Sequence, residues 1–299
     1  MDEKYFIEIE NIIRKNLDER GMDRINLPGE FKKGVKDLLK SSTVFIVTGF
    51  VIRDTLTGET DGPIGAISLA SALENLGKKV VLVTDKYSKE MLYNCCMVKH
   101  MKTPIEVVPY NNAEEFCNDL LIKYNPSHIV GIERPGRAMD GCCYSMRGED
   151  LSDLVPNTDI LFEKSKELGI TTLAVGDGGN EVGMGKVTSF VVNSVNKGGQ
   201  ICANTATDYL IVAGVSNWGG HALVAALSIL SHTMLLHDSI TEILLLESML
   251  RAGGVDGCTK KPTLSVDGLS LDENLQILER LRRIVEKALN KQREKIVAV

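Results

Sequence analysis

The chain lacks the short signatures that mark a nucleotide or metal site. The apolar run at residues 43–48 leads into no Gly-x-Gly-x-x-Gly, and no Walker sequence occurs. None of the 5 histidines has the H-E-x-x-H spacing of a zinc protease. The 7 cysteines include no C-x-x-C, so we take them to be reduced thiols and assign them no chemistry. No nucleotide cofactor is expected.

Targeting and charge signals are also missing. The first ten residues, MDEKYFIEIE, have neither the basic-then-apolar layout of a secretion signal nor the Arg/Ser bias of a transit peptide. No hydrophobic run approaches the length of a membrane span. With 34 basic and 40 acidic residues, the net charge is −6, and no Lys/Arg cluster forms a nucleic-acid surface. These absences predict a cytoplasmic protein with no membrane and no nucleic-acid partner.

What the 299 residues do contain is typical of a globular protein, with 43% hydrophobic and 25% charged residues. Apolar runs without polar alternation, typical of buried parallel strands, occur at 43–48, 79–84, 105–108, 127–132, 170–175 and 209–214. Helices are predicted between and around them at 6–17, 31–39, 63–76, 88–99, 113–123, about 217–236 and 271–289. This alternation predicts an α/β fold, an open, mostly parallel, Rossmann-like sheet with helices on both faces. We divide the chain into an N-terminal helical segment, residues 1–42, and an α/β domain, residues 43–299.

The first candidate site segment is the loop after the strand at 43–48. It runs from Gly49 to Gly62, is longer than a plain connection needs, and carries Glu59, Thr60 and Asp61. In open α/β sheets, ligands bind outside the carboxyl ends of the strands, where helix N-termini offer N–H groups to anions. We therefore predict that these five residues contribute to a ligand site. Asp61 has an alternative role as the cap of the helix that follows, since Asp is favoured there.

A second polar segment follows the strand at 127–132. It holds Glu133, Arg134, Arg137 and Asp140, and Arg147 comes shortly after. A guanidinium can bind both oxygens of a carboxylate, so these arginines predict a site for an acidic substrate. Any one of them could instead form a surface ion pair, whereas the cluster at a strand end favours ligand binding.

The densest segment is the glycine-rich stretch LAVGDGGNEVGMG at 173–185. Its glycines permit unusual backbone angles and close approach to a ligand. Asp177 and Glu181 flank Asn180, and their carboxylates suit acid, base or metal-binding roles. A turn alone explains two or three glycines but not the flanking acids, so we place Asp177, Gly178, Gly179, Asn180 and Glu181 in the site.

Polar residues later in the chain are more ambiguous. Asn217 follows the strand at 209–214, where it can cap the next helix or bind ligand. His221 is interpreted as structural because no nucleophile is paired with it, and the other histidines have no metal-ligand spacing. Asp256 and Asp267 each precede a glycine and are interpreted first as turn residues.

Together these segments resemble one known family. The stretches ETDGP at 59–63, IERPGRAMDG at 132–141, YSMRG at 144–148, GDGGNEVGMG at 176–185, SNWGG at 216–220 and VDGL at 266–269 are similar to the D-glutamate cyclase family. The resemblance extends over about residues 44–269. It implies a lyase that dehydrates D-glutamate reversibly to 5-oxo-D-proline, with this small molecule as the expected partner.

The implied reaction can be matched to the predicted site as a hypothesis. Cyclisation needs a carboxylate base and a carboxylic acid with separated pKa values, and Asp61, Asp177 and Glu181 are the catalytic candidates. The arginines would bind the α-carboxylate, and N–H groups of Gly178 and Gly179 would stabilise the tetrahedral oxyanion. The sequence leaves open which carboxylate is the acid, whether Mg²⁺ or Mn²⁺ binds, and whether the chain forms a homo-oligomer.

Two other functions fit the same residues. One is a metal-dependent phosphate-ester enzyme acting on a small metabolite, in which carboxylates hold Mg²⁺ and glycine loops cradle phosphate. The other is a non-catalytic amino-acid-binding protein. ATP turnover that depends on metal would favour the first, and ligand stabilisation without product would favour the second.

Overall fold

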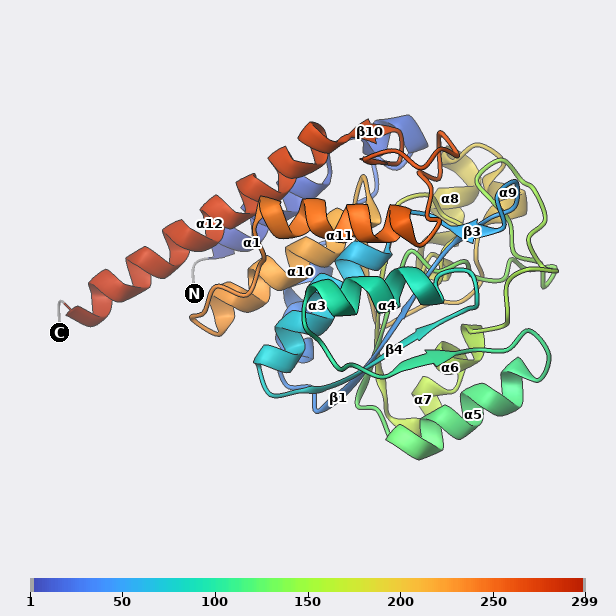
Figure 1. Ribbon diagram of the computed structural model, residues 1–299, viewed down its shortest axis with the longest axis horizontal. Helices are drawn as coiled ribbons and strands as arrows, with labels where there is room; N and C mark the ends of the chain where they lie inside the picture. The colour runs from blue at the N-terminus through green and yellow to red at the C-terminus, as the bar shows by residue number, and fades with distance from the viewer. Residues whose placement is uncertain (1–2, 298–299) are drawn as a thin grey trace.

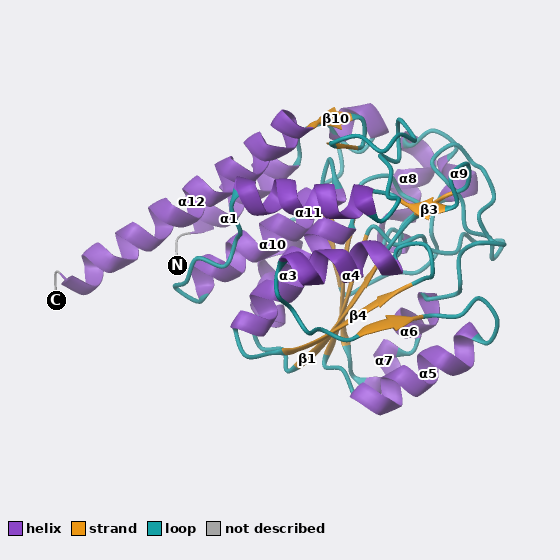
Figure 2. Cartoon of the chain, viewed as in Figure 1, coloured by secondary structure: helices purple, strands orange, loops and turns teal. Residues whose placement is uncertain are grey.

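Six parallel strands form the central sheet of the computed structural model, which describes residues 3–297 (Figures 1 and 2). The strand order is β5-β4-β1-β6-β7-β8. The strands are β1 Thr43–Thr48, β4 Lys79–Thr84, β5 Ile105–Val107, β6 His128–Ile132, β7 Thr171–Gly176 and β8 Tyr209–Val212. The predicted α/β class, an open parallel sheet with helices on both faces, is confirmed.

The central strand β1 shows why these segments form strands. Val44 and Ile46 join the apolar core on one face of the sheet, and Phe45 and Val47 join the core on the other. Burial on both faces explains the continuous apolar run. Counted along the chain, the sheet strands have the order 3-2-1-4-5-6, which reverses direction between β1 and β6. Ligands of doubly wound sheets bind outside the strand ends at this switch point.

Helices cover both faces of the sheet (Figure 1). One face packs against α3 Pro63–Asn75 and α10 Ser216–Leu230, which share a core with α1 Glu3–Ile13, α2 Glu30–Leu38, α4 Lys89–Val98, α11 Ser239–Arg251 and α12 Leu271–Val297. The opposite face carries α5 Ala113–Tyr124, α6 Asp159–Glu163 and α7 Ser165–Leu168. Shorter elements are η1 Leu17–Arg20, η2 Gly185–Val187, α8 Thr188–Ser194, α9 Gly198–Ile201 and the hairpins β2 Val51–Ile52 with β3 Thr57–Gly58 and β9 Ser265–Val266 with β10 Leu269–Ser270.

The N-terminal segment packs on this same core. Phe6, Ile9 and Ile13 of α1 are buried, and α1 contacts α10 and α12. Figure 1 shows α1 beside the long α12, which extends beyond the body of the molecule. The division at residue 42 stays a prediction, but residues of α1 and α2 contribute to the core. No helix within residues 3–297 is both long and apolar enough to cross a bilayer.

Several helical predictions differ from the structure: the helix predicted at 6–17 spans Glu3–Ile13, and the short helices α6, α7, α8 and α9 were not predicted. Two longer segments also differ. The helix predicted to reach about residue 236 ends at Leu230, because His232 takes a left-handed backbone angle (φ 58°) and Thr233 donates its N–H to the Ser228 carbonyl. Helix α11 was not predicted. Its N-cap, Asp238, accepts a hydrogen bond from the Thr241 N–H at 2.9 Å, a capping signal that the sequence does contain.

A glycine pair allows α3 and α10 to cross closely. A Cβ atom built on Gly220 would lie 2.6 Å from the Cα of Gly65, closer than real contacts allow. The two helices therefore touch backbone to backbone. Because both helices begin at the carboxyl edge of the sheet, this contact sets the positions of their N-termini.

We expect Gly220→Ala to destabilise the fold by about 1–3 kcal/mol, since the added methyl group must push α3 and α10 apart. Urea unfolding would measure the change. Gly199→Ala is the matched control, because its Cβ would meet nothing within 4 Å in the short helix α9. Equal stability of the two variants would contradict the close crossing.

Candidate functional site

The candidate site is a pocket at the switch point, beyond the ends of β1 and β6. Its volume of about 130 Å³ is smaller than the roughly 300–1,000 Å³ of pockets that hold drug-sized ligands, so it fits a compact metabolite. The residues that line it are Arg20, Phe50, Val51, Ile52, Arg53, Glu59, Glu133, Ser145, Met146, Arg147, Glu149, Leu151, Asn180, Gly257, Cys258, Lys260 and Asp267. Four of these are acids, contributed by distant parts of the chain.

Asp61 and Asn217 fasten the two helix N-termini to each other. The Asp61 carboxylate accepts the N–H groups of Ser216 at 2.8 Å and Asn217 at 2.7 Å, which open α10. In return, the Asn217 side-chain oxygen accepts the N–H groups of Gly62 at 3.0 Å and Gly65 at 2.8 Å, which open α3. Asp61 thus caps α10, the partner helix, and it also accepts the Gly62 N–H at 2.9 Å just before α3. The N–H groups expected to meet an anion are donated to these side chains.

Glu181 organises the glycine-rich loop from within. Its carboxylate accepts the N–H groups of Asp177 at 3.0 Å, Gly178 at 2.7 Å and Gly179 at 2.7 Å. The oxyanion hole proposed for Gly178 and Gly179 therefore does not match the structure, because Glu181 already receives both donors. Asn180 lines the pocket, and its amide donates to the Tyr144 carbonyl at 2.7 Å.

Arg20 reaches the site from η1 in the N-terminal segment. Its guanidinium lies 3.1 Å from Asp177 Oδ1 and 2.5 Å from Asp267 Oδ2. Sequence reasoning missed Arg20, since it belongs to none of the motifs and lies far from them in the chain.

Asp267, interpreted first as a turn residue, has a left-handed backbone (φ 54°) and also lines the pocket. Asp256 is a turn residue, as predicted, with its carboxylate bonded to three nearby N–H groups.

Glu133 connects the pocket to the buried acids behind it. It follows β6 with a left-handed backbone angle (φ 45°), and its Oε2 accepts the Ser216 hydroxyl at 2.6 Å. One carboxylate oxygen from each of Glu133, Asp177 and Glu181 lies within 4.8 Å of the others. Asp61, Asp177 and Glu181, the predicted catalytic acids, lie outside the pocket lining, whereas Glu133 reaches it.

Burial dominates the electrostatics of these acids. It raises the pKa of Asp61 to about 8, with the nearby Asp267 adding to the rise and the N–H groups of α10 opposing it. Burial also raises the pKa of Glu59, Glu133 and Asp177 well above the usual range, and neighbouring carboxylates add to each shift. The edge of the sheet therefore holds several carboxyl groups that keep a proton more readily than free Asp or Glu.

The three predicted arginines differ in whether their guanidinium groups are available to a ligand. Arg134 is buried and fully engaged, with hydrogen bonds to the Gly49 carbonyl, to Thr158 and to Pro156, and an ion pair with Asp85. It therefore has no free edge for a substrate carboxylate.

Arg137 and Asp140 also lie outside the pocket lining. Arg137 donates to the carbonyl of Gly141, and Asp140 accepts the Tyr144 hydroxyl at 2.6 Å. Arg147 differs from Arg134 and Arg137 because it lines the pocket, where its guanidinium donates to the Cys258 carbonyl at 3.3 Å.

The first loop contributes one pocket acid and several supporting contacts. Glu59 lines the pocket, and a Cβ on Gly257 would collide with its carboxylate at 1.7 Å. Thr60 is fully buried, and its hydroxyl donates a hydrogen bond to the Ser265 carbonyl at 2.9 Å. Gly49 and Gly62 have left-handed backbone angles that allow the sharp bends on either side of this loop.

The carboxylates also form an oxygen-rich cluster suited to a cation. Asp177 shares one group of oxygens with Asp61 and Asp267, and another with Glu133 and Glu181, each within 4.8 Å. Neither Asp177 oxygen accepts a hydrogen bond from residues 3–297, although Arg20 forms its ion pair there. Carboxylate-only sets of this kind suit Mg²⁺ or Mn²⁺.

Fold and site together define an α/β protein with a carboxylate-rich, metabolite-sized pocket at the switch point of a parallel sheet. The model of the family described as "D-glutamate cyclase-like, C-terminal" matches residues 9–282, and the chain belongs to this family. The resemblance predicted from the motifs is confirmed. The match begins upstream of those motifs and includes Arg20.

Two curated proteins show the similarity at the level of sequence. The chain is 35% identical over 237 residues to human "D-glutamate cyclase, mitochondrial", covering 75% of this chain and 38% of that protein. It is 24% identical over 205 residues to "Phospholipid-transporting ATPase neo1" of Schizosaccharomyces pombe, covering 68% of this chain and 18% of that protein. The matched part is therefore well under half the length of either relative.

The raised pKa values predict that stability falls as pH rises. A carboxyl with a higher pKa in the folded chain stabilises it fully below the unfolded pKa, and this contribution is lost as pH rises through the folded pKa. For Asp61 that window runs from about pH 4 to about pH 8. We expect the free energy of unfolding to be lower at pH 8 than at pH 5 by more than about 1 kcal/mol, since one pKa unit corresponds to about 1.4 kcal/mol.

Urea titrations at the two pH values would measure this fall. Glu133→Gln is the informative variant, because the amide oxygen still accepts the Ser216 hydroxyl while the titrating group is removed. The difference between pH 5 and pH 8 should be smaller in this variant. A wild-type protein that gains stability from pH 5 to pH 8 would contradict the assignment of proton-retaining carboxyls.

Proposed function

We propose that the protein is a D-glutamate cyclase-like lyase that interconverts D-glutamate and 5-oxo-D-proline by loss and gain of water. The observation that carries the proposal is the pairing of arginines with proton-retaining acids around one small pocket. Family membership and the name of the human relative support it. A dicarboxylic amino acid matches this pocket in size and charge.

Arg147 and Arg20 are the groups proposed to bind the substrate's α-carboxylate. Both line the pocket, and a guanidinium binds a carboxylate through two parallel hydrogen bonds. Binding here folds the substrate so that its amine meets its γ-carboxyl carbon. Well-oriented intramolecular reactions reach effective molarities of about 10⁵ M or more, so this orientation supplies much of the acceleration.

Glu133 is the proposed proton carrier. In cyclisation, the neutral amine forms the N–C bond with the carbon of the protonated γ-carboxyl group, and the amine nitrogen loses one proton. The C–O bond to the hydroxyl group breaks, and this hydroxyl departs as water after it receives one proton. Burial keeps the pKa of Glu133 high, so its carboxyl group can supply that proton near neutral pH. Asp267, ion-paired with Arg20, is placed to accept the proton that the amine loses. The neighbouring carboxylates of Glu181 and Asp61 add to this rise in the pKa of Glu133.

A divalent cation is compatible with the same residues. Asp177, with oxygens that accept no hydrogen bond within the described chain, would hold Mg²⁺ or Mn²⁺ together with Asp61 and Asp267, or with Glu133 and Glu181. Such an ion would polarise the γ-carboxyl oxygen as a Lewis acid. The requirement for a cation, like a homo-oligomeric state and a cytoplasmic location, stays a prediction; the human relative is named as mitochondrial.

The phosphate-ester alternative receives less support from the geometry. Phosphate sites in such folds use free N–H groups at helix N-termini, but here Asp61 and Asn217 accept those N–H groups.

The purified protein should convert 5-oxo-D-proline into D-glutamate without ATP, and should convert the L-enantiomer far more slowly. When arginine holds the α-carboxylate, only one enantiomer of the substrate has its reacting groups correctly placed relative to the Glu133 carboxyl. Chiral chromatography of the mixture, with and without Mg²⁺ or Mn²⁺, would detect the product. No D-glutamate under any of these conditions would contradict the proposal, and ligand stabilisation without product would favour the binding protein.

Two variants distinguish activity of this protein from activity of a contaminating enzyme. Glu133→Gln should lower kcat by about 100-fold or more, within the range that general acid catalysis contributes. Glu115→Gln, an exposed change on α5 across the sheet, should leave kcat unaltered. Equal activity in both variants would remove Glu133 from the mechanism.

A further inference from the structure

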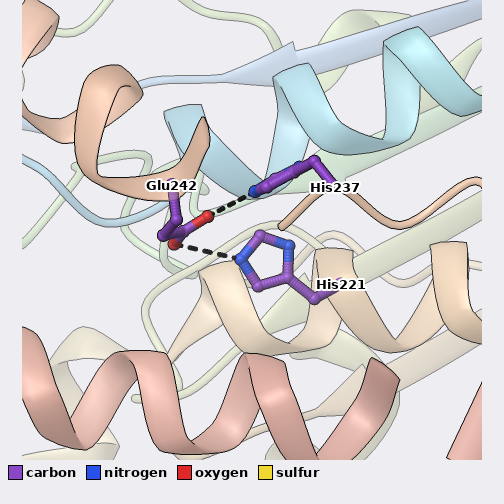
Figure 3. Close-up of side chains that lie close together, drawn as sticks. All are labelled: His221, His237 and Glu242. Carbon is purple, nitrogen blue, oxygen red and sulfur yellow. Dashed lines mark hydrogen bonds and ion pairs between the residues drawn. The ribbon is translucent and has the colours of Figure 1, made fainter. Parts of the chain in front are cut away.

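A second cluster of ligating side chains lies away from the pocket, between α10 and α11. It consists of His221 on α10, His237 in the loop before α11, and Glu242 on α11 (Figure 3). All three are buried, with 1%, 7% and 5% of their surfaces exposed. None of them lines the pocket described above.

The three side chains point toward one another. Figure 3 shows the Glu242 carboxylate facing both rings, and each Nε2 contacts a different carboxylate oxygen. The distances are 3.2 Å from His221 and 2.5 Å from His237, and the ring centroids are 5.2 Å apart. One donor atom from each residue lies within 4.8 Å of the other two.

We propose that His221, His237 and Glu242 form a structural zinc site that fastens α10 to α11. Two imidazoles and one glutamate are a recognised zinc donor set in which a water is the fourth ligand, and nitrogen donors favour zinc over the Mg²⁺ or Mn²⁺ suited to the carboxylate cluster. Ligands on one tetrahedral ion with bonds of about 2.0–2.2 Å are about 3.3–3.5 Å apart. The His221–Glu242 distance of 3.2 Å is already close to this value, and the His237–Glu242 distance of 2.5 Å would have to lengthen as the ion enters.

The surroundings of the cluster favour a cation. A carboxylate in the protein interior is costly unless a cation or a metal pairs with it. Of the charged groups near the cluster, Asp238 is negative, and Lys99 and Arg282 are positive. His221 Nδ1 has no hydrogen-bond partner among residues 3–297, so the ring is held mainly from its Nε2 side.

The proposed role is structural because the cluster is closed to substrate. His221 lies about one turn beyond Ser216 and Asn217, which hold Glu133 and Asp61. Zinc would therefore fix the start of α10, and through it the pocket acids, without touching the substrate. This inference is independent of the reaction proposed above.

The test measures zinc retained by the full chain. Because the site is buried, the protein is unfolded in urea, refolded with ZnCl₂ or CoCl₂, and dialysed against metal-free buffer. We expect one zinc per chain by mass spectrometry, a higher Tm than the protein refolded without metal, and visible absorption from four-coordinate Co²⁺.

Three variants locate the metal. His237→Gln keeps an N–H donor for Glu242 but cannot ligate zinc, so it should fold and lose zinc affinity by more than the roughly 10–100-fold typical of losing a second-shell partner. His232→Gln, which changes an exposed histidine, should retain zinc. Asp177→Asn, which alters the carboxylate cluster, should also retain it.

Three results would overturn the site. The first is a natively refolded wild type that retains no zinc. The second is equal zinc in wild type and His237→Gln, and the third is loss of zinc in Asp177→Asn. Because metal content, Tm and Co²⁺ absorption are all read without substrate, failure of the cyclase assay leaves this test unaffected.

Discussion

The guanidinium of Arg20, in contact with Asp177 and Asp267, is the interaction on which the carboxyl edge of this sheet depends. The edge gathers acidic groups whose burial alone would be strongly unfavourable. Two responses appear in the structure: Arg20 supplies a positive charge that pairs with Asp177 and Asp267, and burial raises the pKa of Glu59, Asp61 and Glu133 so that these carboxyls retain protons. The same arrangement gives a pocket both an anion-binding group and a proton donor, which are the two parts that cyclisation requires.

The acids are held in place by the fold itself. Asp61 caps the start of α10, and Asn217 caps the start of α3. The contact between Gly65 and Gly220 allows the N-termini of these two helices to approach each other. Ser216, the first residue of α10, then holds Glu133 at the end of β6. Strand ends, helix starts and pocket acids therefore form one connected network. A change in the packing of α10 should be felt at the pocket.

The sequence predicts the sheet well because buried parallel strands are continuous apolar runs, and it predicts the site region because polar loops follow those strands. It fails where partners are distant in the chain. No sequence motif predicts the contact between Arg20 and Asp177 or the capping of α10 by Asp61. The sequence also does not show that Arg134 is paired with Asp85, which lies 49 residues away in the chain. Glu181 likewise suits catalysis in sequence but serves its own loop in the structure.

A double-mutant cycle on Arg20 and Asp177 tests the central claim most directly. Free energies of unfolding would be measured at pH 8 for wild type, Arg20→Gln, Asp177→Asn and the double variant. We predict that Arg20→Gln destabilises the protein and that Asp177→Asn restores part of the loss, with a coupling free energy of about 1 kcal/mol or more. Additive effects, with a coupling within about 0.3 kcal/mol of zero, would contradict the claim that Arg20 balances the buried acids.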